Sequence, residues 1–233
     1  MKPDFTDSDP KTYVRLLRTA LEPHADPAYA VEMKAYLRNQ FEFFGMKSPL
    51  RKVIFKEFFD EHGIPSPEKL PEAAHLLLGE DEREFHYFAI ESASKHRKLW
   101  DQRSVELFES MAVRRSWWDS VDYIRGVCLK EYFLAFPDLR EAVSERWRSS
   151  ENFWLQRLAV TFQIGYKTRT DTALLVKNID AVKDSDEFFV QKAIGWALRD
   201  YGKTDPDFVE AYVSKAGLKP LSKREALKRI RRK

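Results

Sequence analysis

Apolar side chains recur along this chain at the three- and four-residue spacing of amphipathic helices, and no alternating strand pattern is visible. Proline, glycine, asparagine and aspartate interrupt the spacing roughly every 12 to 20 residues, an ordinary helix length. Asp26-Pro27, Ser48-Pro49 and Ser66-Pro67 each place a capping residue before a proline suited to the first helical turn. Pro137-Asp138 and Asp205-Pro206 interrupt between helices. The pattern therefore predicts an all-α chain.

Three segments that open with aromatic residues follow one another at a step of 35 residues: Trp118–Asp122, Phe153–Arg157 and Phe188–Lys192. The same step, taken backwards from Asp122, reaches Tyr87 and then Lys52. Helical pairs that recur at a fixed period indicate a solenoid, in which residues at one phase line one surface. We therefore expect a ladder of residues along the inner, binding surface, namely Lys52, Tyr87, Asp122, Arg157 and Lys192.

The ladder mixes three cations, which suit a phosphate backbone, with one carboxylate, which does not. Trp118 lies one helical turn before Asp122, and Lys192 lies one turn before Trp196. An aspartate between two electron-rich indole faces is a candidate site for a positively charged ligand. The competing interpretation makes both tryptophans core residues and Asp122 a surface acid, and the spacing alone favours it.

The net charge of +3 is unevenly distributed. Residues 219–233 hold eight cations and one acid, so they contribute +7 and leave −4 for the other 218 residues. This basic tail either contacts phosphates or forms a solvated, partly frayed helix end. The start of the chain lacks the pattern of a secretory signal, and no apolar run of about 18 residues occurs. We therefore expect a protein of the bacterial cytoplasm.

Metal and covalent chemistry are disfavoured by the remaining residues. The five histidines lack metal-ligand spacing, and the single cysteine, Cys128, lies in an apolar stretch that predicts burial. No glycine-rich phosphate loop occurs, and no lysine has the apolar setting of a Schiff-base nucleophile. We expect neither a metal nor a cofactor.

Several long blocks resemble the DNA alkylation repair family, specifically AlkD-type DNA glycosylases. The resemblance covers most of the chain, and it is present in 36–39, 43–45, 116–122, 152–157, 187–196, Arg199, Tyr201, 203–204 and 220–226. It implies a HEAT-like repeat fold, a single domain over 1–233 curved into a C with DNA in its concavity. It also implies excision of N3- and N7-alkylated purines, and some bulky cationic adducts, without metal or cofactor.

The resemblance also assigns residues. The catalytic aspartate matches Asp122, the two site tryptophans match Trp118 and Trp196, and a backbone-contacting arginine matches Arg157. Tyr36 falls where the family has a DNA-facing tyrosine. Lys47 departs from the glutamine expected near the duplex. With Lys192, Lys52 and Tyr87 of the ladder, these residues form the expected DNA-binding set.

The expected function is that of a monofunctional DNA glycosylase in base-excision repair, which acts as a monomer on duplex DNA with alkylated purines and does not flip the base. The alternative is a non-catalytic relative that binds DNA structures, which would be expected to lose the two tryptophans and Asp122. A more distant alternative is a helical-repeat scaffold for protein partners.

Overall fold

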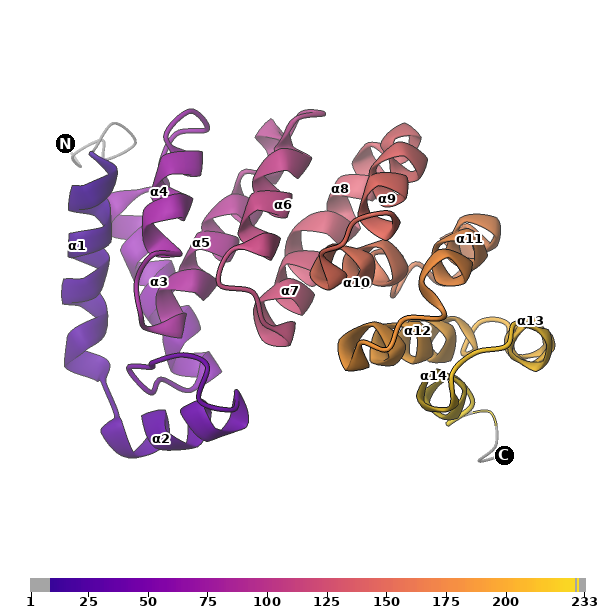
Figure 1. The fold of residues 1–233 in the computed structure, drawn as a ribbon. Coiled ribbons are helices and arrows are strands. Elements are labelled where there is room, and N and C mark those ends of the chain that lie inside the picture. The colour runs from indigo at the N-terminus through magenta and orange to yellow at the C-terminus, as the bar shows by residue number, and fades with distance from the viewer. Residues whose placement is uncertain (1–8, 229, 231–233) are drawn as a thin grey trace. The chain divides into compact units, whose positions relative to one another are not determined.

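The computed structural model describes residues 9–228 and 230, in which helices joined by turns and loops form the fold (Figure 1). Within this part of the chain the only extended pairing is an isolated bridge between Glu42 and Glu82. The all-α prediction is therefore confirmed. The α-helices are α1 (Pro10–Leu21), α2 (Pro27–Tyr36), α3 (Ser48–His62), α4 (Leu70–Leu77), α5 (Arg83–Lys95), α6 (Ser104–Val113), α7 (Trp118–Ile124), α8 (Lys130–Ala135), α9 (Arg140–Arg148), α10 (Phe153–Thr161), α11 (Thr172–Val182), α12 (Phe188–Tyr201), α13 (Pro206–Lys215) and α14 (Pro220–Ala226).

The predicted 35-residue period sets the starts of five helices. Helices α3, α5, α7, α10 and α12 begin at Ser48, Arg83, Trp118, Phe153 and Phe188, each 35 residues after the one before. Every ladder residue is consequently the fifth residue of its helix. A second helix or helical segment follows each of these before the next repeat begins. This is the pattern of a helical-repeat solenoid, as the sequence predicts.

The helix starts follow local capping chemistry where an aspartate precedes a proline. The Asp26 carboxylate accepts the Tyr29 amide at 3.0 Å, and Asp205 caps α13 in the same way. The predicted caps at Ser48 and Ser66 are wrong. Ser48 already belongs to α3, because the extended residue before it is Lys47. Ser66 instead opens a turn, because its carbonyl accepts the Leu70 amide.

The chain divides into two compact units, Met1–Arg115 and Ser116–Lys233. In the first unit α1 packs against α3 and α4, and α4 packs against α5 and α6. Its core is aromatic: the Phe88 ring lies 4.6 to 6.0 Å from the rings of Phe55, Phe58, Phe59 and Tyr13. These contacts join α5 to α3 and α1.

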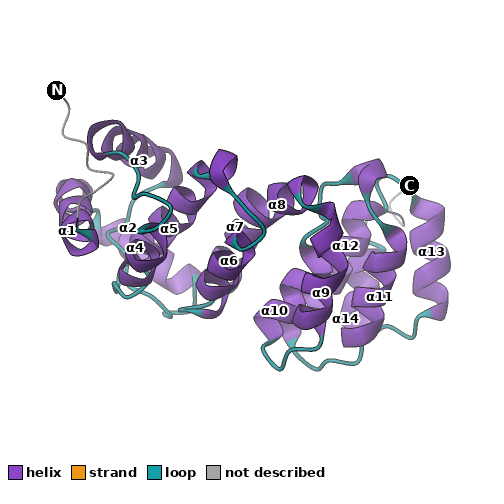
Figure 2. Ribbon diagram, turned by 90° about the horizontal axis from the view of Figure 1, so that it is seen from above, coloured by secondary structure: helices purple, strands orange, loops and turns teal. Residues whose placement is uncertain are grey.

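The second unit forms two layers of helices. In one layer α10 lies between α7 and α12, and in the other α9 lies beside α11 (Figure 2). Helix α10 also packs against α9 and α11, and α12 packs closely on α14. The close approach requires Gly195, because a Cβ there would collide with the Glu225 side chain and lie 3.0 Å from the Ser222 carbonyl. This packing fixes the part of α12 that holds Lys192 and Trp196.

None of the helices in the described chain is both long enough and apolar enough to cross a bilayer.

Candidate functional site

The Asp122 carboxylate is held by two parallel hydrogen bonds from Arg157. Nε of Arg157 donates to Oδ1 at 2.9 Å, and Nη2 donates to Oδ2 at 2.8 Å. The two side chains come from the same position of consecutive repeats, on α7 and α10. A bidentate pair of this kind fixes the orientation of a carboxylate as well as its charge. The Asp122 side chain keeps 19% of its surface exposed, whereas Arg157 keeps only 6%.

Arg157 is itself fixed by the next repeat. Its Nη1 donates to the backbone carbonyl of Phe189, the second residue of α12, at 2.7 Å. Each of the three guanidinium nitrogens therefore has a protein acceptor. The expected contact of Arg157 with a DNA phosphate stays a prediction, but the structure shows its guanidinium nitrogens bonded within the protein and its side chain buried. The geometry makes Arg157 the residue that positions Asp122.

Trp196 covers one side of this pair. The Arg157 Cζ lies 5.8 Å from the centroid of the Trp196 ring, and the Arg125 Cζ lies 5.0 Å from it. Trp196 is half-buried, and so is Trp118, which begins α7 one turn before Asp122. The two tryptophans are therefore neither fully packed core residues nor freely exposed ones. The Trp196 indole therefore lies against the arginine that holds Asp122, and Trp118 lies one turn before Asp122 on the same helix.

Aromatic rings pack on one another at the amino ends of α7, α10 and α12; Trp154 is buried, and Trp117 and Phe189 are partly buried. The Trp117 ring lies 5.2 Å from Phe189 and 6.0 Å from Trp154, and the Trp154 ring lies 4.9 Å from Phe189. The aromatic residues that open successive repeats thus pack on one another. Phe189 serves twice, because its ring joins this cluster while its carbonyl holds Arg157.

A glutamine precedes the ladder residue in the last two repeats, Gln156 before Arg157 and Gln191 before Lys192, and both glutamines have a structural role. Nε2 of Gln156 donates to the Ser150 carbonyl at 2.8 Å, and Nε2 of Gln191 donates to the Ser185 carbonyl at 3.2 Å. Each glutamine ties its helix to the loop six residues earlier. The glutamine therefore stabilises the loop that precedes its helix. The cation that follows it in the sequence is the candidate for a functional role.

The cation in the last repeat, Lys192, is already paired. Its Nζ lies 3.2 Å from Glu225 of α14, and the other Glu225 oxygen accepts Nη1 of Arg199 at 2.6 Å. Burial opposes ionisation of Glu225, but the hydrogen bonds from Lys192 and Arg199 outweigh it and lower the pKa of this carboxyl. The sequence reasoning did not single out Glu225 or Arg199 as an anchor for Lys192.

The beginning of the basic tail is an integral helix. Ser222, Glu225 and Ala226 of α14 are buried against α12, and Lys219 pairs with Asp186. This part is therefore not the frayed helix end considered from the sequence. The tail cations Arg229, Arg231, Arg232 and Lys233 lie outside the described residues.

In the first unit, three of the four predicted DNA-binding residues are exposed. Tyr36, at the end of α2, exposes 71% of its surface, and Lys47 and Lys52 are exposed at the start of α3. Nζ of Lys47 lies 5.2 Å from the Tyr29 ring centroid.

The fourth residue, Tyr87, is buried, unlike the other three. It exposes only 9% of its surface, and the Arg51 guanidinium covers its ring with Cζ 4.1 Å from the centroid. Tyr87 occupies the predicted phase of the repeat, but it is packed, so its side chain has little surface for DNA. The periodic position did not reveal that a neighbouring arginine covers it.

The loop before α3 is pinned from within the first unit. The buried Glu84 carboxylate accepts the backbone N–H groups of Phe44, Gly45 and Met46 at 3.0 to 3.3 Å. Burial nevertheless raises the pKa of Glu84, against the opposing effect of these hydrogen bonds. Gly45 has a φ angle of +95°, a backbone conformation that residues with a side chain rarely adopt. The position of Lys47 is thereby fixed by its immediate neighbours in the chain.

Arg125 is the residue at the site that the sequence reasoning missed. It begins the π-helical turn Arg125–Leu129, three residues after Asp122. The signal available in the sequence was that spacing, which places both side chains on one side of a helix. The π-helical turn itself has no recognisable signal in the sequence, although such turns are frequent at functional sites.

Among the described residues, no group of three or more histidine, cysteine, aspartate or glutamate side chains is arranged to hold a metal ion. Cys128 is buried as predicted, and burial raises the pKa of its thiol.

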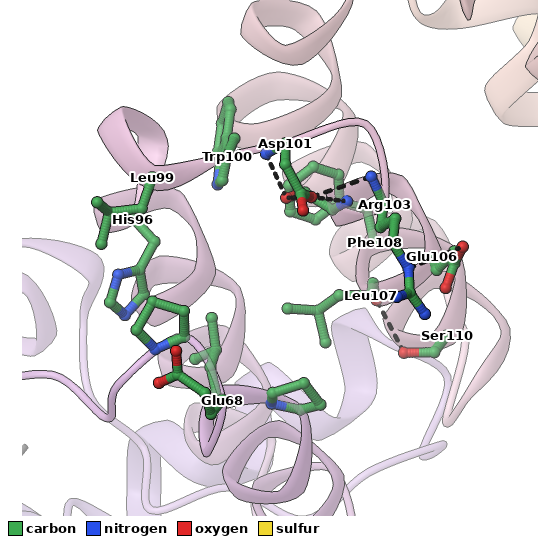
Figure 3. Close-up of a pocket in the computed structure, with 14 residues that line it drawn as sticks. Glu68, His96, Leu99, Trp100, Asp101, Arg103, Glu106, Leu107, Phe108 and Ser110 are labelled. Atoms are coloured by element: carbon green, nitrogen blue, oxygen red, sulfur yellow. Dashed lines mark hydrogen bonds and ion pairs between the residues drawn. The ribbon is translucent and has the colours of Figure 1, made fainter. Parts of the chain in front are cut away.

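A cavity of about 590 Å³ lies elsewhere, within the first unit (Figure 3). Its lining residues fall between Pro67 and Ser110, and they include apolar Leu107 and Phe108 beside charged Glu68 and Arg103. None of the predicted site residues lines it.

The fold and the site define the class of this protein: a helical-repeat protein that carries Trp118, Asp122, Arg157 and Trp196 on its repeat helices. Comparison with known proteins gives its family. A family model described as "DNA alkylation repair enzyme" matches residues 17–230. This chain belongs to the DNA alkylation repair enzyme family. No curated protein matches the chain.

Three solved structures are similar to this one. A protein from Enterococcus faecalis, described as a predicted DNA alkylation repair enzyme, shares 34% identity, with a TM-score of 0.82 over 88% of this chain and 96% of that one. The smu.31 protein of Streptococcus mutans shares 18% identity, with a TM-score of 0.59 over 78% and 96%. AlkD2 from Streptococcus mutans shares 16% identity, with a TM-score of 0.60 over 85% and 96%. The last two comparisons support the fold alone.

Proposed function

We propose that this protein is a monofunctional DNA glycosylase that excises positively charged N3- and N7-alkylated purines from duplex DNA. The observation that supports this most is the Asp122 carboxylate, which Arg157 holds in one orientation, with the half-buried indole of Trp196 against that same arginine. Membership of a DNA alkylation repair family supplies the substrate class.

The chemistry suits a site of this composition. A purine alkylated at N3 or N7 already carries a positive charge, so it can leave without protonation by an acid. All five histidines lie before residue 116, so the unit that holds Asp122 has no histidine acid. As the bond to the base breaks, positive charge develops on the deoxyribose, as in glycoside cleavage. A fixed carboxylate at that position stabilises the developing charge.

Each residue then has a distinct role. Asp122 stabilises the oxocarbenium ion and orients the attacking water. Trp118 and Trp196 hold the sugar through their electron-rich faces. Arg157 keeps the Asp122 carboxylate in position. Lys192, Tyr36, Lys47 and Lys52 bind the phosphate backbone.

We propose further that the lesion is excised without being flipped into a pocket. Enzymes that flip a base read it in a fitted cavity. The residues assigned here address the sugar instead, so selectivity depends on the charge and lability of the lesion. Bulky cationic adducts are then acceptable substrates and neutral lesions are not.

The test is release of free base from two duplexes of the same sequence, one with N7-methylguanine and one with hypoxanthine, a neutral damaged base. The proposal predicts release from the first duplex only, with the strand left intact at the abasic site because no lysine forms a Schiff base. Rapid release of hypoxanthine would contradict the charge-based mechanism. Strand cleavage that accompanies base release would contradict the monofunctional assignment.

A further inference from the structure

Two arginines contact the Trp196 ring, and their hydrogen bonding differs sharply. Arg157 makes three hydrogen bonds of 2.7 to 2.9 Å. Arg125 makes one, from Nη1 to the Ile164 carbonyl at 3.5 Å, the outer limit for such a bond. Nε of Arg125 is buried and has no partner. A guanidinium has five N–H donors, and a buried donor without an acceptor is destabilising.

The charge of Arg125 is also poorly compensated. Burial lowers its pKa, while the nearby charges of Asp122 and Asp200 raise it and that of Arg157 lowers it. Asp122 is already bound to Arg157. Asp200 accepts the Gly165 amide at 2.6 Å and Lys203 at 2.5 Å. Neither carboxylate hydrogen-bonds to Arg125, so the site has a guanidinium in need of an anionic acceptor.

The backbone places this guanidinium beside the catalytic carboxylate. Arg125 follows Asp122 by three residues, and the π-helical turn that begins there widens the helix at this point. The Arg125 side chain reaches the same indole ring as Arg157. A free cation there would oppose the positive charge of the lesion, whereas a cation neutralised by a bound anion would not.

We propose that Arg125 binds a DNA phosphate next to the lesion, through the Nη donors of its weakly bonded guanidinium. This inference rests on the proposed function and gives to Arg125 the phosphate contact that the sequence assigned to Arg157. The guanidinium fork matches two phosphate oxygens, and the phosphate charge shields the lesion from Arg125. Lys192 is less suited to this contact, because it is paired with Glu225.

The experiment measures binding to a duplex with a tetrahydrofuran abasic analogue, in which each phosphate flanking the analogue is replaced in turn by a neutral methylphosphonate. The proteins are wild type, Arg125→Met, and Lys215→Met, which removes one exposed cation from α13 of the same unit. At one flanking position the replacement should weaken wild type and Lys215→Met about tenfold but leave Arg125→Met unchanged. With the all-phosphate duplex, Arg125→Met should also lower the salt slope of log K by about 1.

The proposal would be overturned if methylphosphonate replacement lowered the DNA affinity of wild type and Arg125→Met equally at every flanking position. An equal loss of salt slope in Lys215→Met would also overturn it, because the effect would then be one of net charge. Thermal melting checks that each variant folds. If Arg125→Met does not fold, Arg125→Lys keeps the charge without the fork and should show a reduced penalty at the same position.

Base release from N7-methylguanine duplex by wild type is measured in parallel. If base is released but the methylphosphonate effect does not depend on Arg125, only this inference is contradicted. Binding with coupling but without release supports the phosphate contact and contradicts the proposed glycosylase activity.

Discussion

At the scale of single residues, the site depends on how one carboxylate is held. Asp122 could rotate about its side-chain bonds if it were a surface acid, and its charge would then be poorly placed. The two hydrogen bonds from Arg157 remove this freedom, and the Phe189 carbonyl removes it from Arg157 in turn. Preorganised charge stabilises a transition state more than mobile charge does, because it needs no reorientation as the reaction proceeds.

Arg157→Lys tests this positioning role. Lysine keeps the positive charge but cannot make two parallel hydrogen bonds and a third to Phe189. The single-turnover rate of base release should fall by about tenfold or more, equivalent to about 1.4 kcal/mol of transition-state stabilisation. DNA affinity should change little, since Arg157 is buried. A large loss of affinity with an unchanged rate would instead return Arg157 to the role of a phosphate contact.

A second residue-scale prediction concerns Glu225 and pH. The pKa of Glu225 is lowered in the folded protein from its ordinary 4.5. The unfolded chain therefore takes up the proton first as the pH falls, and the stabilisation present above pH 4.5 is lost below it. The melting temperature of wild type should exceed that of Glu225→Gln at neutral pH, and the difference between the two temperatures should become smaller below pH 4.5. Glu210→Gln, exposed on α13, is the matched control, and a gap that stays constant with pH would contradict the prediction.

At the scale of elements, the repeat explains why so much could be predicted from the sequence. Each aromatic helix start must pack on the next, as Trp117, Trp154 and Phe189 do, so the period is visible in residue types. Helical spacing drew attention to Trp118, Asp122 and Trp196, but spacing alone favoured core tryptophans, and the family resemblance carried the assignment. The rest depends on contacts between repeats, which spacing does not encode. Three features could not be predicted from spacing: Arg51 covers Tyr87, Glu225 pairs with Lys192, and a π-helical turn begins at Arg125.

Gly195→Ala tests the packing of α12 on α14. The added methyl group would collide with the Glu225 side chain, so the two helices must separate or shift. We expect a loss of about 1 to 3 kcal/mol in the free energy of unfolding, measured in urea. Base release should also fall, because Trp196 is the next residue. Gly126→Ala is the control for stability, since a Cβ there meets nothing within 4 Å, and equal losses in both variants would refute the steric explanation.

At the scale of the whole molecule, the small net charge of +3 conceals a division of roles. The residues assigned to chemistry, Asp122, Trp118 and Trp196, all belong to the second unit. Exposed Lys47 and Lys52, with Tyr36, belong to the first. If the first unit contacts only the phosphate backbone of the DNA, its cations should affect DNA affinity and not the rate of the chemical step.

The double variant Lys47→Met, Lys52→Met tests this division. Its affinity for duplex DNA should fall, and the salt slope of log K should decrease by up to about 2, one for each phosphate contact. Its single-turnover rate at saturating protein should match wild type. Lys56→Met on the same helix is the control, because Lys56 is paired with Asp60. A lowered rate at saturation would show that the first unit takes part in more than binding.

The central claim is that Asp122 performs the chemistry of an alkylpurine glycosylase. The most direct measurement is release of free base from N7-methylguanine duplex by wild type and Asp122→Asn side by side, with DNA binding measured for both. Release by wild type alone, with binding retained in the variant, is the predicted result. Undiminished release by Asp122→Asn would contradict the assignment of the carboxylate, and binding by both proteins without any release would identify a non-catalytic DNA-binding member of the family.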